Sequence, residues 1–259
     1  MRDILGERDE VVPDVTTRVA EPSRESQLPK KFYKDVSVSS VDEGWQIELD
    51  GRSVKTPGKA LLAVSSKPLA ECIAEEWRAQ SERIDPMTMP LTRLLNTALD
   101  AVAGEIQGVK EDIIRFAGTD MICYRADGPE GLVSRQIDHW DPLVEWAQSK
   151  LGCRFTLIEG VMHHEQPAES IAGFSTHVGM IDDPLVLAAT HVITALTGSA
   201  TIALAVLYGE LSCDEAWAAA HVDEDWNIEQ WGEDEEATSR RETRRKDMIA
   251  ACRVISESK

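Results

Sequence analysis

The chain has 259 residues and a formal net charge of -19 at neutral pH, which disfavours binding to nucleic acids or to anionic membranes through bulk electrostatics. This length is sufficient to bury a large core in one large domain or two modest ones. The five cysteines are widely spaced and form no CxxC pair, so a zinc ribbon and a disulfide framework are both disfavoured, and a reducing compartment fits best.

Residues 1–28 contain no apolar signal-peptide core, and their arginines are outnumbered by acidic residues. Organelle transit peptides are poor in acids, so we expect neither secretion nor import, and we expect a cytoplasmic protein. Because this stretch can bury too little apolar surface to become ordered, it is predicted to be a disordered acidic tail.

Residues 29–88 carry the signals of a small antiparallel sheet. Apolar and polar residues alternate over 36–49, Asp50-Gly51 is a strong hairpin signal, and a further short strand is expected over 61–64. The segment after Ser66 has one apolar stripe at helical spacing, and a small sheet needs such a helix over one of its faces. We therefore expect a mostly-β N-terminal domain with a covering helix.

Strand signals nearly vanish in residues 89–259, which are predicted to form a larger, all-helical C-terminal domain, with at most a brief strand over 155–158. The fold class is therefore α+β. Helices are expected over residues 91–102, 106–116, 136–151 and about 167–178.

The most apolar stretch, from Asp183 to Gly209, is predicted to be two buried helices back to back. Asp183-Pro184 is a helix start signal, and Gly198-Ser199 ends one helix and begins the next. Helices that are apolar all round must be buried in protein or lipid, and each half is too short to cross a bilayer. We therefore expect a core hairpin, with no membrane insertion, in which His191 is a satisfied core histidine.

The segment from Asp214 to Glu236 contains ten acidic residues and no Lys or Arg, together with three tryptophans. One interpretation is a partner-binding surface in which tryptophan anchors are surrounded by acids, since tryptophan is prominent among interface anchors. The other is that amphipathic helices turn their tryptophans to the core and their acids to solvent. The pattern alone does not separate the two.

Signals for catalysis are weak. Walker-type phosphate loops, GxGxxG, GxSxG and HExxH are all absent from the chain. The best metal candidate is His163-His164-Glu165, but adjacent histidines point in different directions and no second cluster with ligand spacing supports them. A polar loop is the alternative. A metal-dependent hydrolase that uses His163 and His164 is the competing interpretation of the function.

Three motifs resemble those of a known family. They are MPLTRLLNTA over residues 89–98, WDPL over 140–143, and WNIEQWG over 226–232 after Asp223-Glu224-Asp225. The chain resembles the assembly chaperones that hold the alpha subunit of the F-type ATP synthase. The absence of a transit peptide points to a bacterial member, and the resemblance covers roughly residues 32–254.

The resemblance implies a non-enzymatic chaperone without a cofactor, monomeric alone, which protects the unassembled alpha subunit until a beta subunit replaces it. It also implies the α+β fold described above. A third class, a permanent structural subunit of the ATPase, would remain in the assembled enzyme. The partner-binding residues that the resemblance implies are Glu224, Asp225, Trp226, Glu229, Trp231, Glu233 and Asp234, of which Glu233 and Asp234 lie where the sequence departs from the family pattern.

If residues 226–231 form a helix, Glu229 and Trp226 share a face of it. We expect this carboxylate, beside an exposed indole, to take an Arg or Lys of the partner. Trp231 would then point elsewhere, into the core.

Overall fold

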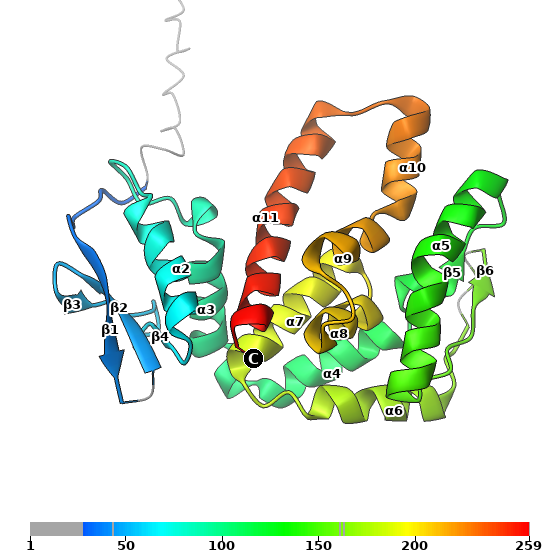
Figure 1. Ribbon diagram of the computed structural model, residues 1–259, viewed down its shortest axis with the longest axis horizontal. Helices are drawn as coiled ribbons and strands as arrows, with labels where there is room; N and C mark the ends of the chain where they lie inside the picture. Colours follow the sequence, from blue (N-terminus) through cyan, green and yellow to red (C-terminus); the bar gives the residue numbers. More distant parts are fainter. Residues whose placement is uncertain (1–27, 43, 161, 163, 259) are drawn as a thin grey trace, which may run out of the picture.

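The computed structural model describes residues 28–42, 44–160, 162 and 164–258. Figure 1 shows a small sheet at one end of the molecule, α2 and α3 beside it, and the remaining helices beyond them. The predicted α+β fold class is confirmed. The tail predicted over residues 1–28 lies outside the described residues except for Leu28, whose carbonyl accepts a hydrogen bond from Arg83 Nη1 at 2.5 Å.

The sheet is antiparallel and centred on β2. Strand β1 pairs along the whole of β2, and β3 and β4 also pair with β2. The predicted turn at Asp50-Gly51 is present, with φ of 49° at Asp50 and 74° at Gly51. The Asp50 carboxylate accepts hydrogen bonds from the backbone of residues 34 and 35, which fixes the turn to the start of the sheet. The strand bounds are Val36–Val41 for β1, Gly44–Leu49 for β2, Arg52–Ser53 for β3 and Ala63–Val64 for β4.

Helix α2 (Lys67–Arg78) covers one face of this sheet, as predicted. Ser66 caps it by accepting a hydrogen bond from Leu69 N, and Leu69 and Ile73 are buried against the apolar side of the strands, where Ile47 is fully buried. The covering helix thus supplies the second layer that a small sheet requires.

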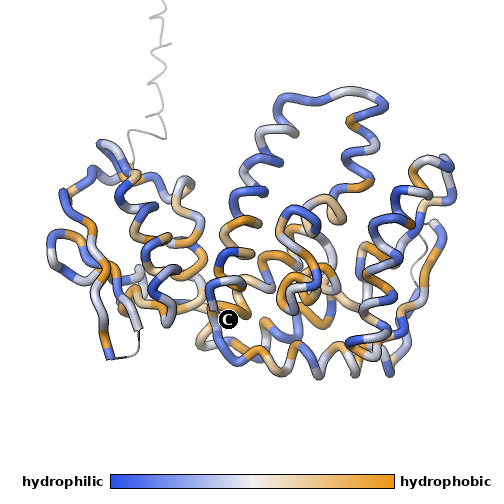
Figure 2. The backbone as a smooth tube through the Cα atoms, viewed as in Figure 1, coloured by the Kyte–Doolittle hydropathy of each residue, from blue (hydrophilic) through white to orange (hydrophobic). Residues whose placement is uncertain are grey.

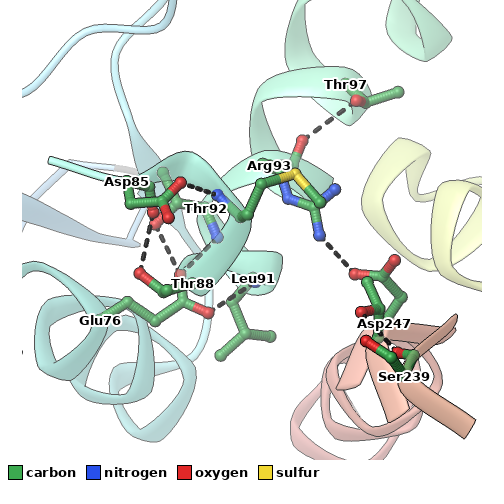
Figure 3. A network of polar contacts seen from close by, with 11 residues as sticks. Glu76, Asp85, Thr88, Leu91, Thr92, Arg93, Thr97, Ser239 and Asp247 are labelled. Carbon is green, nitrogen blue, oxygen red and sulfur yellow. Dashed lines mark hydrogen bonds and ion pairs between the residues drawn. The ribbon is translucent and has the colours of Figure 1, made fainter. Parts of the chain in front are cut away.

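The first of the three sequence motifs forms the junction between α2 and the helical part. Pro90 starts α3 (Pro90–Asp100), and the Glu76 carboxylate of α2 accepts hydrogen bonds from Leu91 N at 2.7 Å and Thr92 N at 2.8 Å. These are backbone donors that a helix N-terminus leaves unpaired. Figure 3 shows this cap and, on the other side of α3, the ion pair of Arg93 with Asp247 of α11. The motif therefore ties three helices together.

The helical part also contains a two-residue parallel pair, β5 (Tyr124–Arg125) with β6 (Ile158–Glu159). Strands this short leave little period-two signal in a sequence. Helix α5 begins at Glu130, before the expected Gln136, and contains Pro142 in its interior. The other helices of this part have the bounds Ile106–Ala117 for α4, Glu130–Trp146 for α5, Ala168–Gly179 for α6, Pro184–Thr197 for α7, Ala200–Tyr208 for α8, Cys213–Ala220 for α9, Val222–Trp231 for α10 and Glu235–Glu257 for α11.

The predicted core hairpin is present as α7 and α8. Asp183 and Ser199 cap the two helices through their side chains, and Gly198 and Gly209 end them in the left-handed conformation, with φ of 67° and 76°. Leu187, Ile193 and Leu204 are fully buried, so the hairpin lies at the centre of the helical part. Among the described residues, no helix has both the length and the apolar character needed to span a bilayer.

The prediction for His191 is wrong in its location. His191 is half-buried, and its Nε2 lies 2.6 Å from Asp112 Oδ2 of α4. It lines a cavity of about 330 Å³ together with Arg93 and Asp247. The histidine is satisfied by a carboxylate of α4, and it lies on the wall of this cavity rather than in the closed core of the hairpin.

Candidate partner-binding site

The acidic segment forms a projecting arch. We use this name for α10, the connecting residues 232–234 and the part of α11 from Glu235 to Lys246. Figure 1 shows the arch extending beyond the other helices, and Figure 2 shows that most of it is hydrophilic. An element that leaves the body of a protein in this way has little core on which to bury its side chains, so individual contacts have to hold it in place.

Local sequence signals explain the helices of the arch. Ser212 and Glu215 form a reciprocal capping box at the start of α9, from which the arch rises. Gly232, with a φ of 88°, ends α10. Asp234 then caps α11 by accepting a hydrogen bond from Ala237 N at 2.8 Å. Asp234 therefore has a structural role in addition to any role toward a partner.

The base of the arch is fastened by two buried aromatic contacts. Trp140 of α5, in the second motif, donates a hydrogen bond from Nε1 to the Ala219 carbonyl of α9 at 2.7 Å. His221 stacks on Trp217 with ring centroids 3.9 Å apart and donates from Nδ1 to the Trp217 carbonyl at 2.8 Å. Burial lowers the pKa of His221, which favours its neutral form beside Glu224, whose Oε2 lies 3.7 Å from His221 Nε2.

Glu229 is paired within the chain rather than left free. Its two carboxylate oxygens accept hydrogen bonds from both terminal nitrogens of Arg135 on α5, at 2.7 and 2.5 Å. The same guanidinium lies over the Trp226 ring, 5.1 Å from its centre. This pairing lowers the pKa of Glu229. We expected Glu229 and Trp226 to form an exposed pair. Instead, Arg135 of α5 binds the Glu229 carboxylate and covers the Trp226 ring, and this contact holds α10 against α5.

Gly131 makes room for this contact. A Cβ at this position of α5 would lie 2.6 Å from the tip of the Trp226 ring, closer than real Cβ atoms approach other heavy atoms. The outer edge of the half-buried Trp226 ring therefore lies directly against α5 at Gly131. A larger residue at position 131 would push the ring away from Arg135.

Two further acids of the arch have partners in the chain. Asp225 forms an ion pair with Arg241 of α11, which joins the two legs of the arch. Asp223 accepts a hydrogen bond from the buried Gln136 of α5 at 2.8 Å. Together with Glu229, these acids brace the arch through contacts within the chain.

The tip of the arch has a different character. Trp231 is 78% exposed, so the prediction that it points into the core is wrong, because α10 has left the body of the protein where Trp231 ends it. Glu233 is exposed and forms no hydrogen bond or ion pair with any other described residue. The structure thus places Trp231, Glu233 and Asp234 together at the free end and the other four predicted residues along the braced leg.

Sequence reasoning missed Gly131, Arg135, Gln136 and Arg241. Arg135 and Glu229 are 94 positions apart in the chain, and no local pattern connects them. One signal was available: the acids of residues 214–236 have no basic residue among them, so any cation that neutralises them has to come from elsewhere.

The described residues do not support the alternative of a metal site. His163 lies outside them, His164 is exposed, and no group of three or more His, Cys, Asp or Glu side chains among them could hold a metal ion.

Comparisons with known proteins agree on one family. Residues 30–148 match the model of the ATP12 chaperone protein family. The mitochondrial protein atp12 of Schizosaccharomyces pombe is 25% identical over 239 residues, which covers 88% of this chain and 82% of that protein. The crystal structure of Atp12 from Paracoccus denitrificans superposes with a TM-score of 0.81 at 35% identity, over 89% of this chain and 99% of that one. A crystal structure of a candidate chaperone from Agrobacterium tumefaciens gives 0.85 at 53% identity, over 90% and 87% of the two chains.

Proposed function

The chain belongs to the ATP12 chaperone family of ATP synthase assembly factors, which are not enzymes, and we propose that it binds the unassembled alpha subunit of that enzyme. It covers a surface of the alpha subunit that would otherwise aggregate, and it leaves when a beta subunit takes its place. It is monomeric on its own and works in the bacterial cytoplasm. Residues 29–88 and 89–259 act as the two domains of this chaperone.

The observation that carries the proposal for the site is the exposed tip of the arch. A large aromatic side chain in contact with water is a typical anchor of a protein interface, and Trp231 stands beside the unpaired Glu233. Such a surface suits a partner that offers an apolar pocket with an Arg or Lys at its edge. The charge of -19 also speeds the approach of a basic surface.

The other predicted residues hold the arch in position and do not form its tip. Asp225, Trp226 and Glu229 are occupied by contacts with Arg241 and Arg135, so we assign them to positioning the arch. Glu224 is only partly exposed and lies near His221. The partner therefore meets Trp231, Glu233 and Asp234 first, on a support whose direction is set by the paired residues.

The test is an aggregation assay with separately expressed subunits. Purified alpha subunit is warmed until it scatters light, with and without an equimolar amount of this protein, and beta subunit is treated identically. The proposal predicts that scattering is suppressed for alpha and not for beta. A chaperone that protects both subunits equally, or neither, contradicts it. A permanent structural subunit would in addition be retained in the purified, assembled ATPase.

A further inference from the structure

Two cysteine thiols meet at the foot of the arch. Cys213 is the first residue of α9, directly after its cap Ser212, and Cys252 lies in the last part of α11. The two helices pack against each other, and both cysteines line one cavity of about 480 Å³. Each thiol also shifts the pKa of the other, as expected for two groups that lie close together on the wall of the same cavity. A small solute in the cavity would thus meet a partly exposed thiol with a second, buried thiol behind it.

The two thiols are not equivalent. The neighbouring thiol of Cys252 lowers the pKa of Cys213, and the nearby guanidinium of Arg245 acts in the same direction against the opposing effects of burial and Asp214. The Cys213 thiol and burial raise the pKa of Cys252. A position at a helix N-terminus also favours the thiolate. Cys213 is therefore the nucleophile of the pair, and Cys252 keeps the proton.

We propose that Cys213 and Cys252 form a dithiol site that reacts with hydrogen peroxide and closes to a disulfide. The Cys213 thiolate attacks one peroxide oxygen and the O–O bond breaks, which gives a sulfenic acid and hydroxide. The Cys252 sulfur then attacks the Cys213 sulfur and the S–O bond breaks. The leaving hydroxide takes the Cys252 proton and departs as water. Two thiols are oxidised by two electrons in total, and one peroxide is reduced to two waters.

The position of this site gives the bond a structural consequence. Helix α9, the whole arch and the part of α11 that follows it lie between the two cysteines along the chain. The disulfide would close all of them into one covalent ring, whereas the reduced protein holds the foot of the arch by noncovalent contacts alone, among them the Trp140 hydrogen bond and the Arg245–Asp214 ion pair. A ring of this size restricts the unfolded chain and is expected to raise the melting temperature by about 5–15 °C. The inference does not depend on the identity of the partner.

The test uses the full chain, fully reduced and then treated with a small excess of hydrogen peroxide. Peptide mapping without reductant should show a Cys213–Cys252 linkage in the monomer, and the melting temperature should rise and return after treatment with dithiothreitol. Cys213→Ser and Cys252→Ser should abolish both changes. Cys72→Ser is the matched control, because Cys72 is also partly exposed and its sulfur accepts a hydrogen bond from Arg253 Nη1 at 3.3 Å. This variant should behave as wild type.

Cys252→Ser offers a second readout, since it removes the resolving thiol and leaves Cys213. A dimedone-type probe should then trap a sulfenic acid at Cys213 and not at Cys72. The proposal is overturned if the oxidised wild-type monomer contains no Cys213–Cys252 linkage. It is also overturned if both thiols remain open to alkylation, or if peroxide oxidises Cys72 in preference to Cys213.

Discussion

Trp140→Phe is the substitution that most directly tests how the arch is attached. Trp140 is 1% exposed and joins α5 to α9 through the 2.7 Å hydrogen bond to the Ala219 carbonyl. Phenylalanine keeps a ring but loses the donor, and a buried acceptor left without a partner costs about 1–3 kcal/mol. The smaller ring leaves a void of roughly 40 Å³, which adds about 1 kcal/mol. We expect a total loss of about 2–4 kcal/mol in the free energy of unfolding.

The assay is thermal and urea unfolding followed by circular dichroism. A loss of this size lowers the melting temperature of a protein of this length by about 4–16 °C. Trp231→Phe is the control, because the same substitution at a side chain that is 78% exposed should change the free energy of unfolding by less than about 0.5 kcal/mol. If the two variants melt within a degree of each other, Trp140 does not fasten the arch and the reasoning fails.

Three further predictions concern the core, the support of the arch and the pH dependence. Leu204→Ala, at a fully buried position, should lower the free energy of unfolding by about 2–5 kcal/mol. Leu207→Ala, at a partly buried position of the same helix, should lower it clearly less. Equal losses of stability in urea unfolding would contradict the core hairpin. Glu229→Gln and Arg135→Gln should each weaken binding of the alpha subunit. Because the two residues act as one pair, the double variant should bind no worse than the single variant that has the lower affinity. Losses of binding free energy that add up in a titration would contradict this. The pKa of Asp112 is lowered chiefly by its hydrogen bond with the half-buried histidine of α7, so its stabilising contribution is present above its unfolded pKa of about 3.9 and is lost as the pH falls through the lower folded value. The stability difference between wild type and Asp112→Asn should therefore shrink below about pH 4, and a constant difference would refute the assignment.

The parts of the fold that were predictable from sequence are those governed by local rules. The hairpin at Asp50-Gly51 and the helix boundaries at Asp183, Gly198 and Ser199 all depend on backbone conformations and caps that nearby residues specify. The uniform apolar character of α7 and α8 likewise required burial, whatever their neighbours were.

The errors came from contacts between distant residues. The location of Trp231 depends on where the body of the protein ends, and the periodicity of α10 carries no information about that. The third motif points to Glu229, but the partner of this residue, Arg135, belongs to another helix. His191 looked like a core residue because its sequence neighbours are apolar, whereas Asp112 of α4 provides a polar contact from outside the hairpin.

The most direct test of the proposed function is the affinity of the isolated alpha subunit for three forms of this protein. Wild type should bind alpha and leave isolated beta unbound. Trp231→Ala should weaken alpha binding by about 10-fold or more, the loss typical of an aromatic anchor. Phe32→Ala, at an aromatic residue that is 74% exposed and contacts Tyr33 beside α2 rather than the arch, should bind like wild type, and both variants should keep the wild-type melting temperature. If Trp231→Ala binds alpha as tightly as wild type does, the tip of the arch is not the partner-binding site, and if beta binds as tightly as alpha, the proposed partner is wrong.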